Sequence, residues 1–297
     1  MRVAIVGATG MIGRRLTSAL LAGGHEVLAI SRRGESVADA PGVVWDPASG
    51  PLAPAALAGV DAVVNLAGAS IGTGRWTPAR KREIVDSRVV TTAKLVEAIG
   101  TDGPRILVNS SAVGYYGDGD ASVDEAAPAS NDFLGTTCRA WEQAALAGEA
   151  NGVRVVVLRT GVVIARESEV IKRQLLPFKL GLGGPVGGGQ QWWSWIHIDD
   201  ITGLILFALT HPELSGPVNA VAPNAVRQRE FARALGHVLG RPAVVPTPGF
   251  ALKLAMGEMS AIALTGQHVI PRVAIEAGYR FAQPRIEAAL RVELAPA

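Results

Sequence analysis

Short runs of apolar residues alternate with stretches of helical periodicity through the first half of this chain of 297 residues. The runs that predict buried strands occupy residues 3–6, 25–31, 42–46, 61–65, 105–110 and 153–158. Apolar residues at helical spacing predict helices from about residue 12 to Gly23, from 77 to 99 and from 133 to 150. Near-continuous apolar strands that alternate with helices are typical of parallel sheets covered on both faces. We therefore predict an α/β fold, a doubly wound parallel sheet of the Rossmann type.

The pattern changes after Thr160. Further helices are predicted at residues 168–180, 201–209 and 229–239, and a glycine-rich segment lies between the first two of these. We expect a nucleotide-binding domain of residues 1–165, to which 197–220 return, and a smaller, mainly helical substrate lobe. The segments assigned to this lobe are 166–196 and 221–297. Ligands of such folds bind in a cleft at the carboxyl ends of the strands.

Three glycines follow the first strand at three-residue spacing, and a helical pattern begins among them. They are Gly7, Gly10 and Gly13. Such a unit points backbone N–H groups out of a helix N-terminus, where the helix dipole favours an anion. Gly7 allows the tight turn, Gly10 lets the backbone approach a pyrophosphate, and Gly13 lets the helix pack closely on the strand. The spacing G-x-x-G-x-x-G differs from the usual G-x-G-x-x-G pattern. The prediction of a pyrophosphate site therefore depends on the position of these glycines between a strand and a helix.

The second strand ends in Ser31, Arg32 and Arg33. Sites for NAD commonly have an acidic residue here, bonded to the ribose 2′-hydroxyl, and this chain has none. A guanidinium can instead hold a 2′-phosphate through charge-assisted hydrogen bonds, each worth about 1.5–3 kcal/mol. We therefore predict NADP(H) as the cofactor, with these residues at its phosphate. A solvated surface turn is the other interpretation of the two arginines.

Composition and charge narrow the classes of partner. A hydrophobic fraction of 48% suffices for a full sheet with helices on both faces. The net charge of +2 offers no strongly basic surface to nucleic acid, and no apolar run reaches the roughly 18–20 residues of a membrane span. We expect neither a nucleic-acid nor a membrane partner. The single cysteine and the absence of a signal peptide favour a cytoplasmic protein, and no cluster of residues has metal-site spacing.

Several motifs taken together resemble those of one superfamily. They are Gly7-Ala-Thr-Gly-Met-Ile-Gly13, Asn65-Leu-Ala-Gly68, Ser110-Ser-Ala-Val-Gly-Tyr-Tyr-Gly117 and Trp195-Ile-His-Ile-Asp-Asp200. The chain resembles an extended short-chain dehydrogenase/reductase, more narrowly the atypical, epimerase-like branch with its own C-terminal domain of unknown function. Cys138-Arg-Ala-Trp-Glu142 and Gly266-Gln-His-Val-Ile-Pro271 fit that branch. The resemblance covers essentially the whole chain and implies a Rossmann-type fold, an NADP(H) site and a family-specific domain at about 247–295.

Together with the resemblance, the order of strands and loops indicates further residues at the cofactor. They are Thr9, Met11, Ile12, Asp46, Leu66, Ala67, Gly68, Arg88 and Ser110. We expect the loop after Asn65 to pass beneath the adenine or the ribose. Asp46 either contacts the adenine amine or simply begins an Asp-Pro turn. Arg88 either supplies a positive charge near the nicotinamide ribose or points away, since we place the apolar face of its helix at Val85, Val89 and Thr92.

The chain departs from the family at the catalytic pair. Most relatives carry Tyr-x-x-x-Lys on the helix after the fifth strand, but here Thr137 and Trp141 stand at those positions. Ser111 stands where the serine of the family's triad sits. A free phenol has a pKa of about 10, so it is a poor base at neutral pH but a serviceable proton donor. We therefore hypothesise an oxidoreductase that reduces a small carbonyl-type substrate, with Ser111 and Tyr115 or Tyr116 donating to the carbonyl oxygen.

Other candidate groups have plainer interpretations. Asp199 and Asp200 precede a predicted helix, and we interpret them as caps rather than as an acid–base pair. His197 fits a packed core residue, and Cys138 fits a half-buried thiol rather than a nucleophile. The three tryptophans between residues 192 and 195 either line the substrate pocket or hold the glycine-rich segment against the sheet.

A second class of function stays open beside the reductase. A non-catalytic NADP(H)-binding sensor or scaffold would also have lost the Tyr-Lys pair. Many members of the superfamily dimerise by pairing two long helices, here about Thr77–Ile99 and Phe133–Ala150. The resemblance therefore implies a homodimer of that kind.

Overall fold

A seven-stranded parallel sheet forms the centre of the computed structural model, which describes residues 1–294. In spatial order its strands are β11 (Gly216–Ala220), β7 (Arg154–Thr160), β5 (Ile106–Ala112), β4 (Ala62–Asn65), β1 (Arg2–Val6), β2 (Glu26–Ser31) and β3 (Gly42–Val44). Every neighbouring pair runs parallel. The chain builds outward from β1 through β2 to β3 and then continues on the other side of β1 with β4. This is the predicted doubly wound topology, in which ligands bind where the strand order reverses.

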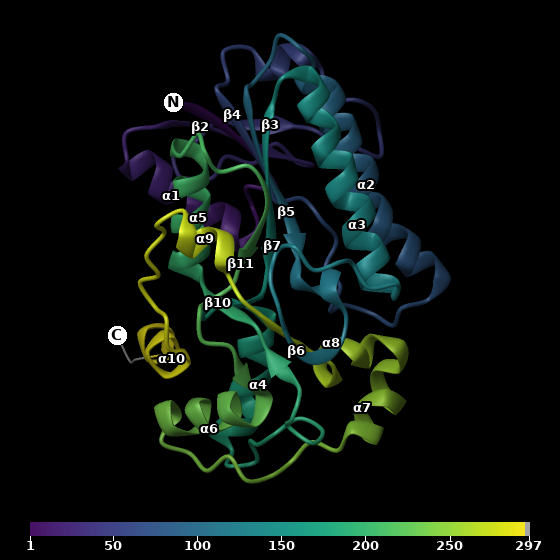
Figure 1. Ribbon diagram of the computed structural model, residues 1–297, viewed down its shortest axis with the longest axis vertical. Coiled ribbons are helices and arrows are strands. Elements are labelled where there is room, and N and C mark those ends of the chain that lie inside the picture. The colour runs from purple at the N-terminus through teal and green to yellow at the C-terminus, as the bar shows by residue number, and fades with distance from the viewer. Residues whose placement is uncertain (295–297) are drawn as a thin grey trace.

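Long helices cover both faces of the sheet (Figure 1). The helices are α1 (Met11–Ala22) and α5 (Ile198–Thr210) on one face, and α2 (Pro78–Ile99) and α3 (Phe133–Leu146) on the other. Alternate side chains of β1 enter the two layers. Val3 and Ile5 join the core under α1 and α5, whereas Ala4 and Val6 join the core under α2 and α3. A strand that is apolar at every position is therefore one that is buried on both faces.

All six predicted strands are present, with their ends shifted by one or two residues. The seventh, β11, was not predicted, because Gly216-Pro-Val-Asn-Ala220 is not a continuous apolar run. Pro217 lacks an N–H group and is confined to positions where none is needed in the ladder. It is tolerated here because β11 is an edge strand that pairs with β7 alone.

The predicted helices are also present, and two of their boundaries are corrected. Thr77 caps α2, since its side chain accepts a hydrogen bond from the backbone N–H of Arg80. The helix predicted to reach residue 150 ends at Leu146, and a tighter 3₁₀ turn follows. The helix predicted to start at Ile201 begins at Ile198. The 3₁₀ turns are η1 (Pro54–Leu57), η2 (Val113–Tyr116), η3 (Ala147–Asn151) and η4 (Gly257–Ser260).

The remaining elements lie mostly below the carboxyl edge of the sheet in Figure 1 and are mainly helical, as predicted. The helices are α4 (Glu169–Lys179), α6 (Gln228–Leu239), α7 (Gly249–Met256), α8 (Ala261–Leu264), α9 (Arg272–Glu276) and α10 (Ile286–Leu294). The short strands are β6 (Gly119–Val123), β8 (Val162–Ile164), β9 (Trp192–Trp193), β10 (Trp195–His197), β12 (Val226–Arg227) and β13 (Gln267–Val269). They form three two-stranded sheets, β10–β8, β12–β9 and β13–β6.

The lobe has an aromatic core of its own. Trp193 and Trp195 are buried there with Phe178 of α4 and Phe231 of α6. This pair therefore packs inside the lobe and does not line an open pocket. No helix within residues 1–294 is both long enough and apolar enough to cross a bilayer.

The start of α1 touches the turn after β1 so closely that no side chain fits between them. A Cβ atom on Gly13 would lie 2.5 Å from the carbonyl oxygen of Gly7 and 2.7 Å from the Cα of Ala8. These are backbone atoms, so they cannot move aside as a flexible side chain could. Gly13 is therefore required for this packing, as the sequence predicted.

We expect Gly13→Ala to lower the free energy of unfolding by about 1–3 kcal/mol, because overpacking outweighs the better helix propensity of alanine. Urea denaturation measures the change. The matched control is Gly50→Ala, where a Cβ meets nothing within 4 Å. That variant should stay within about 0.5 kcal/mol of the parent. Equal stability of the two variants would contradict the packing argument.

Candidate functional site

The glycine turn leaves a bare helix N-terminus at the carboxyl edge of the sheet. Gly7 adopts a φ of +86°, and a Cβ there would come within 3.0 Å of the carbonyl carbon of Leu66. Gly10 is the N-cap of α1, so no side chain caps the helix, and no acidic residue lies in its first turn. Uncapped N–H groups at the positive end of a helix dipole suit a diphosphate. The geometry therefore fits a dinucleotide pyrophosphate over Gly7–Gly13.

The two arginines predicted at the phosphate lie next to this turn. The Gly7 N–H donates to the carbonyl oxygen of Ile30, which places the end of β2 beside the turn. Arg32 and Arg33 follow directly and are exposed, and the only charged partner of Arg33 among residues 1–294 is Glu35, at 3.6 Å. The Ser31 Oγ accepts a hydrogen bond from Gly34 N–H. The turn thus presents two guanidinium groups, and Glu35 is the carboxylate that would compete with a phosphate for Arg33.

Asp46, proposed as an adenine contact, already serves a turn. Its Oδ1 accepts from the Ala48 N–H at 3.1 Å, and its Oδ2 accepts from the Ser49 hydroxyl at 3.3 Å. These bonds are those of an Asp-Pro turn start. The turn interpretation therefore accounts for both carboxylate oxygens.

The loop Leu66–Gly68 is held from beneath by a buried amide. The Nδ2 of Asn65 donates to the Oδ1 of Asn109 at 2.7 Å and to the Oγ1 of Thr92 at 2.9 Å. Its Oδ1 accepts from the Ala67 N–H at 3.2 Å. All polar atoms of this fully buried side chain are thus satisfied, as burial requires. Asn65 fixes the loop on which Leu66, Ala67 and Gly68 lie.

Arg88 points at that loop. The buried face of α2 runs through Ile84, Thr92 and Leu95, not through Val85 and Val89 as expected from sequence. Arg88 is four residues from both Ile84 and Thr92, so it shares their face. Its guanidinium carbon lies 3.2 Å from where a Cβ on Gly68 would be and 5.2 Å from the ring of Trp141. Burial lowers the pKa of Arg88 below its ordinary value.

The two residues at the family's Tyr and Lys positions have structural partners instead. The Oγ1 of Thr137 donates to the carbonyl oxygen of Phe133 at 2.6 Å, one turn back in α3. The Nε1 of Trp141 donates to the Oγ1 of Thr92 at 2.9 Å. Neither side chain presents a phenol or an ammonium group. Arg88 is therefore the cation that this structure places against the Leu66–Gly68 loop.

A buried ion pair that the sequence analysis missed occupies the end of β5. Arg159 donates from Nε and Nη2 to the two carboxylate oxygens of Glu142, at 2.9 and 2.8 Å. Ser111 donates from Oγ to the Oε1 of Glu142 at 2.7 Å. All three are buried. The signal was present in the sequence as Arg159 near the end of the apolar strand at 154–160, and the carboxylate that faces it is on α3.

This network distinguishes the three candidate proton donors. The proton of the Ser111 hydroxyl is directed to Glu142, and that of Tyr116 to the Oδ1 of Asn219 at 2.6 Å. Burial raises the pKa of Tyr116 to about 12, so this phenol stays neutral. The ring of Tyr115 packs on Arg159, whose guanidinium carbon is 3.6 Å from the ring centre. Among residues 1–294, no hydrogen-bond partner holds the hydroxyl of Tyr115.

Cys138 and His197 take the plain roles that the sequence predicted. Cys138 is buried, and this burial raises the pKa of its thiol to about 11, which leaves it unreactive at neutral pH. His197 is fully buried at the start of α5, and its Nδ1 accepts a hydrogen bond from the Asp199 N–H. Its Nε2 lies 3.1 Å from a carboxylate oxygen of Glu293 on α10.

The capping interpretation of Asp199 and Asp200 is wrong, because His197 is the N-cap of α5. Asp199 instead forms an ion pair with Arg15 of α1 at 2.5 Å. Asp200 accepts hydrogen bonds from the backbone N–H groups of Ala282 and Gln283. The two carboxylates therefore join α5 to α1 and to the C-terminal segment, which helical spacing could not reveal.

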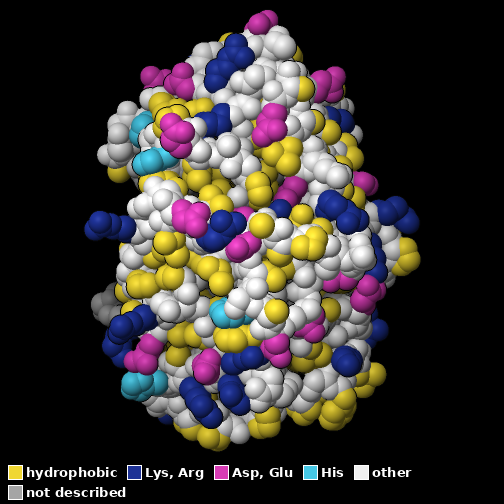
Figure 2. All heavy atoms as spheres, viewed as in Figure 1, with side chains coloured by type: hydrophobic (Ala, Val, Ile, Leu, Met, Phe, Trp, Pro, Cys, Tyr) yellow, Lys and Arg dark blue, Asp and Glu magenta, His cyan; other side chains and the backbone are white. Residues whose placement is uncertain are grey.

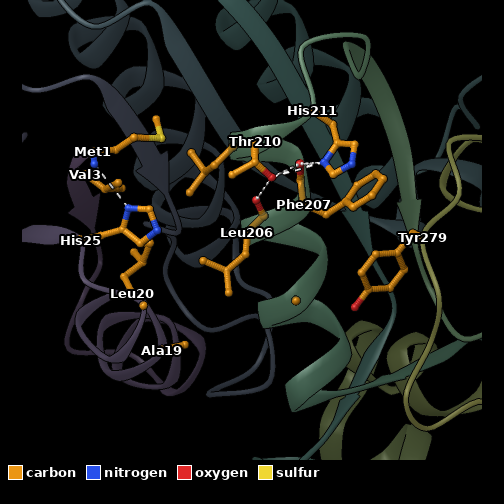
Figure 3. A pocket seen from close by; sticks show the side chains of 13 residues that line it. Met1, Val3, Ala19, Leu20, His25, Leu206, Phe207, Thr210, His211 and Tyr279 are labelled. Carbon is orange, nitrogen blue, oxygen red and sulfur yellow. Dashed lines mark hydrogen bonds between the residues drawn. The ribbon is translucent and has the colours of Figure 1, made fainter.

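A cavity of about 290 Å³ lies away from all these groups. It is lined by residues from the start of β1 and from α1 and α5, at the amino edge of the sheet (Figure 3). Figure 3 shows His25 and His211 on opposite sides of it, with Tyr279 beyond. The predicted chemistry lies at the carboxyl edge, so this cavity has no part in it. No group of three or more His, Cys, Asp or Glu within residues 1–294 could hold a metal ion.

Comparisons with known proteins agree with this geometry. The sequence pattern of the NAD dependent epimerase/dehydratase family matches residues 3–221, and that of a domain of unknown function, DUF1731, matches residues 247–292. The chain is 42% identical to the Arabidopsis thaliana chloroplastic homolog of epimerase family protein SDR39U1, over 98% of this chain and 86% of that protein. It is 41% identical to epimerase family protein ML0860 of Mycobacterium leprae, over 97% of this chain and 94% of that protein.

A solved structure shares the fold throughout. The crystal structure of human epimerase family protein SDR39U1 (isoform 2) with NADPH matches with a TM-score of 0.88 and 38% sequence identity. The match covers 99% of each chain. The similarity therefore extends through the sheet and the helical C-terminal part together.

We expect Glu142→Gln to lower the free energy of unfolding by about 3–5 kcal/mol, because it leaves the buried guanidinium of Arg159 without a counter-ion. The double variant Glu142→Leu/Arg159→Met should recover most of that loss, since no charge then stays buried. Chemical denaturation of the parent, Glu142→Leu, Arg159→Met and the double variant gives the coupling energy. Additive losses in the double variant would show that the two charges do not interact.

Proposed function

Because the chain belongs to the NAD dependent epimerase/dehydratase family, we propose that it is an NADP(H)-dependent oxidoreductase that reduces a small carbonyl compound. The observation that carries the proposal is the uncapped glycine turn at Gly7–Gly13 beside Arg32 and Arg33. No carboxylate stands at the end of β2 to receive a ribose 2′-hydroxyl, as an NAD site commonly requires. The NADPH in the human relative's crystal structure supports the same cofactor.

Each part of the cofactor has a place in this arrangement. The pyrophosphate would lie over Gly7, Gly10 and Gly13, with Thr9, Met11 and Ile12 in the same turn. The 2′-phosphate would reach Ser31, Arg32 and Arg33. Asp46 would lie at the adenosine end with its carboxylate held by its own turn. The loop Leu66–Gly68 and Ser110 would flank the riboses. A dinucleotide bound in this way spans the point where the strand order reverses.

Arg88 is proposed to replace the family's lysine. The lysine of relatives holds the nicotinamide ribose with a positive charge, and here Trp141 stands in its place. Arg88 brings a guanidinium to Gly68 from α2 instead. An arginine stays protonated in proteins, so it supplies the charge at any working pH.

Tyr115 is proposed as the proton donor to the substrate. The bound nicotinamide supplies a hydride, and the carbonyl oxygen then needs a proton. Tyr115 lies at the carboxyl end of β5, and its hydroxyl is not held by any described residue. Ser111 and Tyr116 direct their protons to Glu142 and Asn219, so they keep the site's shape. A neutral phenol donates more readily than it abstracts, which favours reduction over oxidation.

The alternative is a non-catalytic NADP(H)-binding sensor or scaffold. One observation favours it. The side chains of Thr137, Trp141 and Ser111 all form hydrogen bonds to other groups of the protein, as expected of residues that only maintain the shape of a binding site. A homodimer through α2 and α3 and a cytoplasmic location stay predictions under either function.

We expect Arg32→Gln/Arg33→Gln to weaken NADPH binding by about tenfold to a hundredfold, because charge-assisted bonds to the 2′-phosphate are lost. Binding of NADH should change little. Isothermal titration calorimetry with both nucleotides measures the change, and Arg139→Gln, an exposed arginine on α3, is the matched control. A parent protein that binds NADH as tightly as NADPH would overturn the cofactor assignment.

We expect Tyr115→Phe to lower kcat for carbonyl reduction by about 10²–10⁴-fold, the usual contribution of a general acid. Tyr116→Phe should lose stability through its unpaired partners Arg159 and Asn219 but keep kcat within a few-fold. NADPH oxidation with a panel of ketones, enones and quinones gives both values. If NADPH binds and no compound is reduced, the sensor interpretation is supported instead. If the two variants lose the same activity, Tyr115 is not the donor.

A further inference from the structure

A group of exposed apolar side chains covers the lower end of the lobe. Within residues 1–294, seven large apolar side chains are at least 60% exposed, and six of them belong to two segments around α4 and α7. The six are Leu176, Leu180, Leu182, Val244, Phe250 and Leu254. We call these six residues the α4–α7 patch. The seventh is Val44 on the edge strand β3.

The two segments of the patch run side by side. The chain turns back after α4, where Leu182 N–H donates to the carbonyl oxygen of Pro177 at 2.9 Å. It then pairs with the segment before α7, through Val245 N–H to the Gly183 oxygen at 3.1 Å and Thr247 N–H to the Pro185 oxygen at 2.8 Å. Figure 2 shows apolar side chains at the lower right of the molecule, where Figure 1 places α7. The two segments that carry the patch are therefore adjacent.

Helix α7 is apolar, but its residues are exposed or only partly buried. Its sequence, Gly249-Phe-Ala-Leu-Lys-Leu-Ala-Met256, is apolar apart from Lys253, yet none of its residues is buried. The helix is fixed at its C-terminal end, where Arg75 donates to the carbonyl oxygens of Leu254 and Ala255. Exposed apolar surface of this size usually marks an interaction site in a folded protein.

The charges around the patch are mainly positive. Residues 169–182 and 241–258 contain five cations and two carboxylates, although the whole chain has a net charge of only +2. The carboxylates are Glu169, which lies 3.7 Å from Arg173, and Glu258, which pairs with Lys81. The five cations are Lys172, Arg173, Lys179, Arg241 and Lys253, and all are exposed. Three of the chain's five lysines are among them. The other two lysines are occupied, Lys81 by Glu258 and Lys94 by the carbonyl oxygen of Pro47.

We propose that the α4–α7 patch docks this protein on the surface of an anionic lipid bilayer. Apolar side chains surrounded by lysines are the composition of helices that lie in the membrane interface, where long lysine stems keep the ammonium groups at the headgroups. Juxtamembrane lysines and arginines are attracted by anionic lipids. From the sequence we expect no membrane partner, because no apolar run reaches the length of a membrane span, but surface docking needs no spanning segment.

The composition of the patch argues against two other partners, a second copy of this chain and a nucleic acid. A symmetric dimer would place the same patch of two copies face to face, because such interfaces are self-complementary. Each copy would bring five cations and two carboxylates, of which Glu258 is already paired with Lys81 outside the patch, so two surfaces of net positive charge would face each other. Nucleic acid would satisfy the cations but would leave the six apolar side chains without a matching surface. A bilayer offers both hydrocarbon and negative charge.

Vesicle flotation with the full chain tests the proposal. Vesicles of phosphatidylcholine alone are compared with vesicles that contain about one third phosphatidylglycerol. We expect about tenfold or stronger partitioning to the anionic vesicles, and we expect it to fall as salt is raised from about 0.05 to 0.5 M. No flotation with anionic vesicles at low salt, or equal binding to both compositions, would overturn the proposal.

Two sets of variants separate the apolar and the ionic contributions. Phe250→Ser/Leu254→Ser should weaken partitioning by about tenfold or more, and Lys172→Gln/Lys179→Gln/Lys253→Gln should abolish the preference for anionic lipid. The matched controls are Val44→Ser for the first set and Arg82→Gln/Arg139→Gln for the second, since these side chains are exposed elsewhere.

Circular dichroism verifies that each variant is folded, and all the altered side chains are exposed. Full binding by both patch variants would overturn the proposal. So would a concentration-dependent dimer, seen by sedimentation velocity, that the Phe250→Ser/Leu254→Ser variant dissociates, because a second copy would then be the occupant.

Discussion

The contact between the start of α1 and the turn after β1 is the constraint on which the site depends. Gly7 and Gly13 bring two backbones together without any intervening side chain, and Leu66 of the next strand lies against the same turn. The ends of β1, β2 and β4 are thereby held around one uncapped helix N-terminus. Any Cβ at Gly13 would push α1 away and move the N–H groups from the strand ends. Packing and binding geometry are thus consequences of the same two glycines.

Buried polar side chains hold the carboxyl edge of the sheet in shape. Asn65 secures the Leu66–Gly68 loop, and the Glu142–Arg159 pair secures the end of β5 and the ring of Tyr115. Such groups are costly to bury unless every partner is present, which makes their arrangement specific rather than strongly stabilising. The same edge carries a cation at Arg88 and a phenol at Tyr115, beside Thr137 and Trp141, whose side chains form hydrogen bonds within the protein.

The C-terminal segments are attached to the nucleotide-binding sheet through the start of α5. Asp199 pairs with Arg15, Asp200 holds the backbone at Ala282 and Gln283, and His197 faces Glu293. Helix α10 and the segment before it are therefore fixed to the same region as α1. The α4–α7 patch is joined instead to the loop after β4, through Arg75 to the carbonyl oxygens of Leu254 and Ala255 and through Arg173 to that of Gly72.

The sequence alone determined six of the seven strands of the sheet, its long helices, the glycine turn and the arginines after β2. These features depend on local periodicity and on residues within a few positions of one another, so they are visible in one dimension. Only the tertiary structure decided the rest. Arg88 faces the site because α2 buries Ile84 and Leu95, and a helix of mixed polarity does not reveal that phase in its sequence. Ser111 donates to Glu142, which lies 31 residues away, and Asp200 binds backbone 82 and 83 residues away. Contacts between distant segments leave no periodic signal, and the exposure of α7 is equally invisible, because its apolar sequence is what a buried helix would also show.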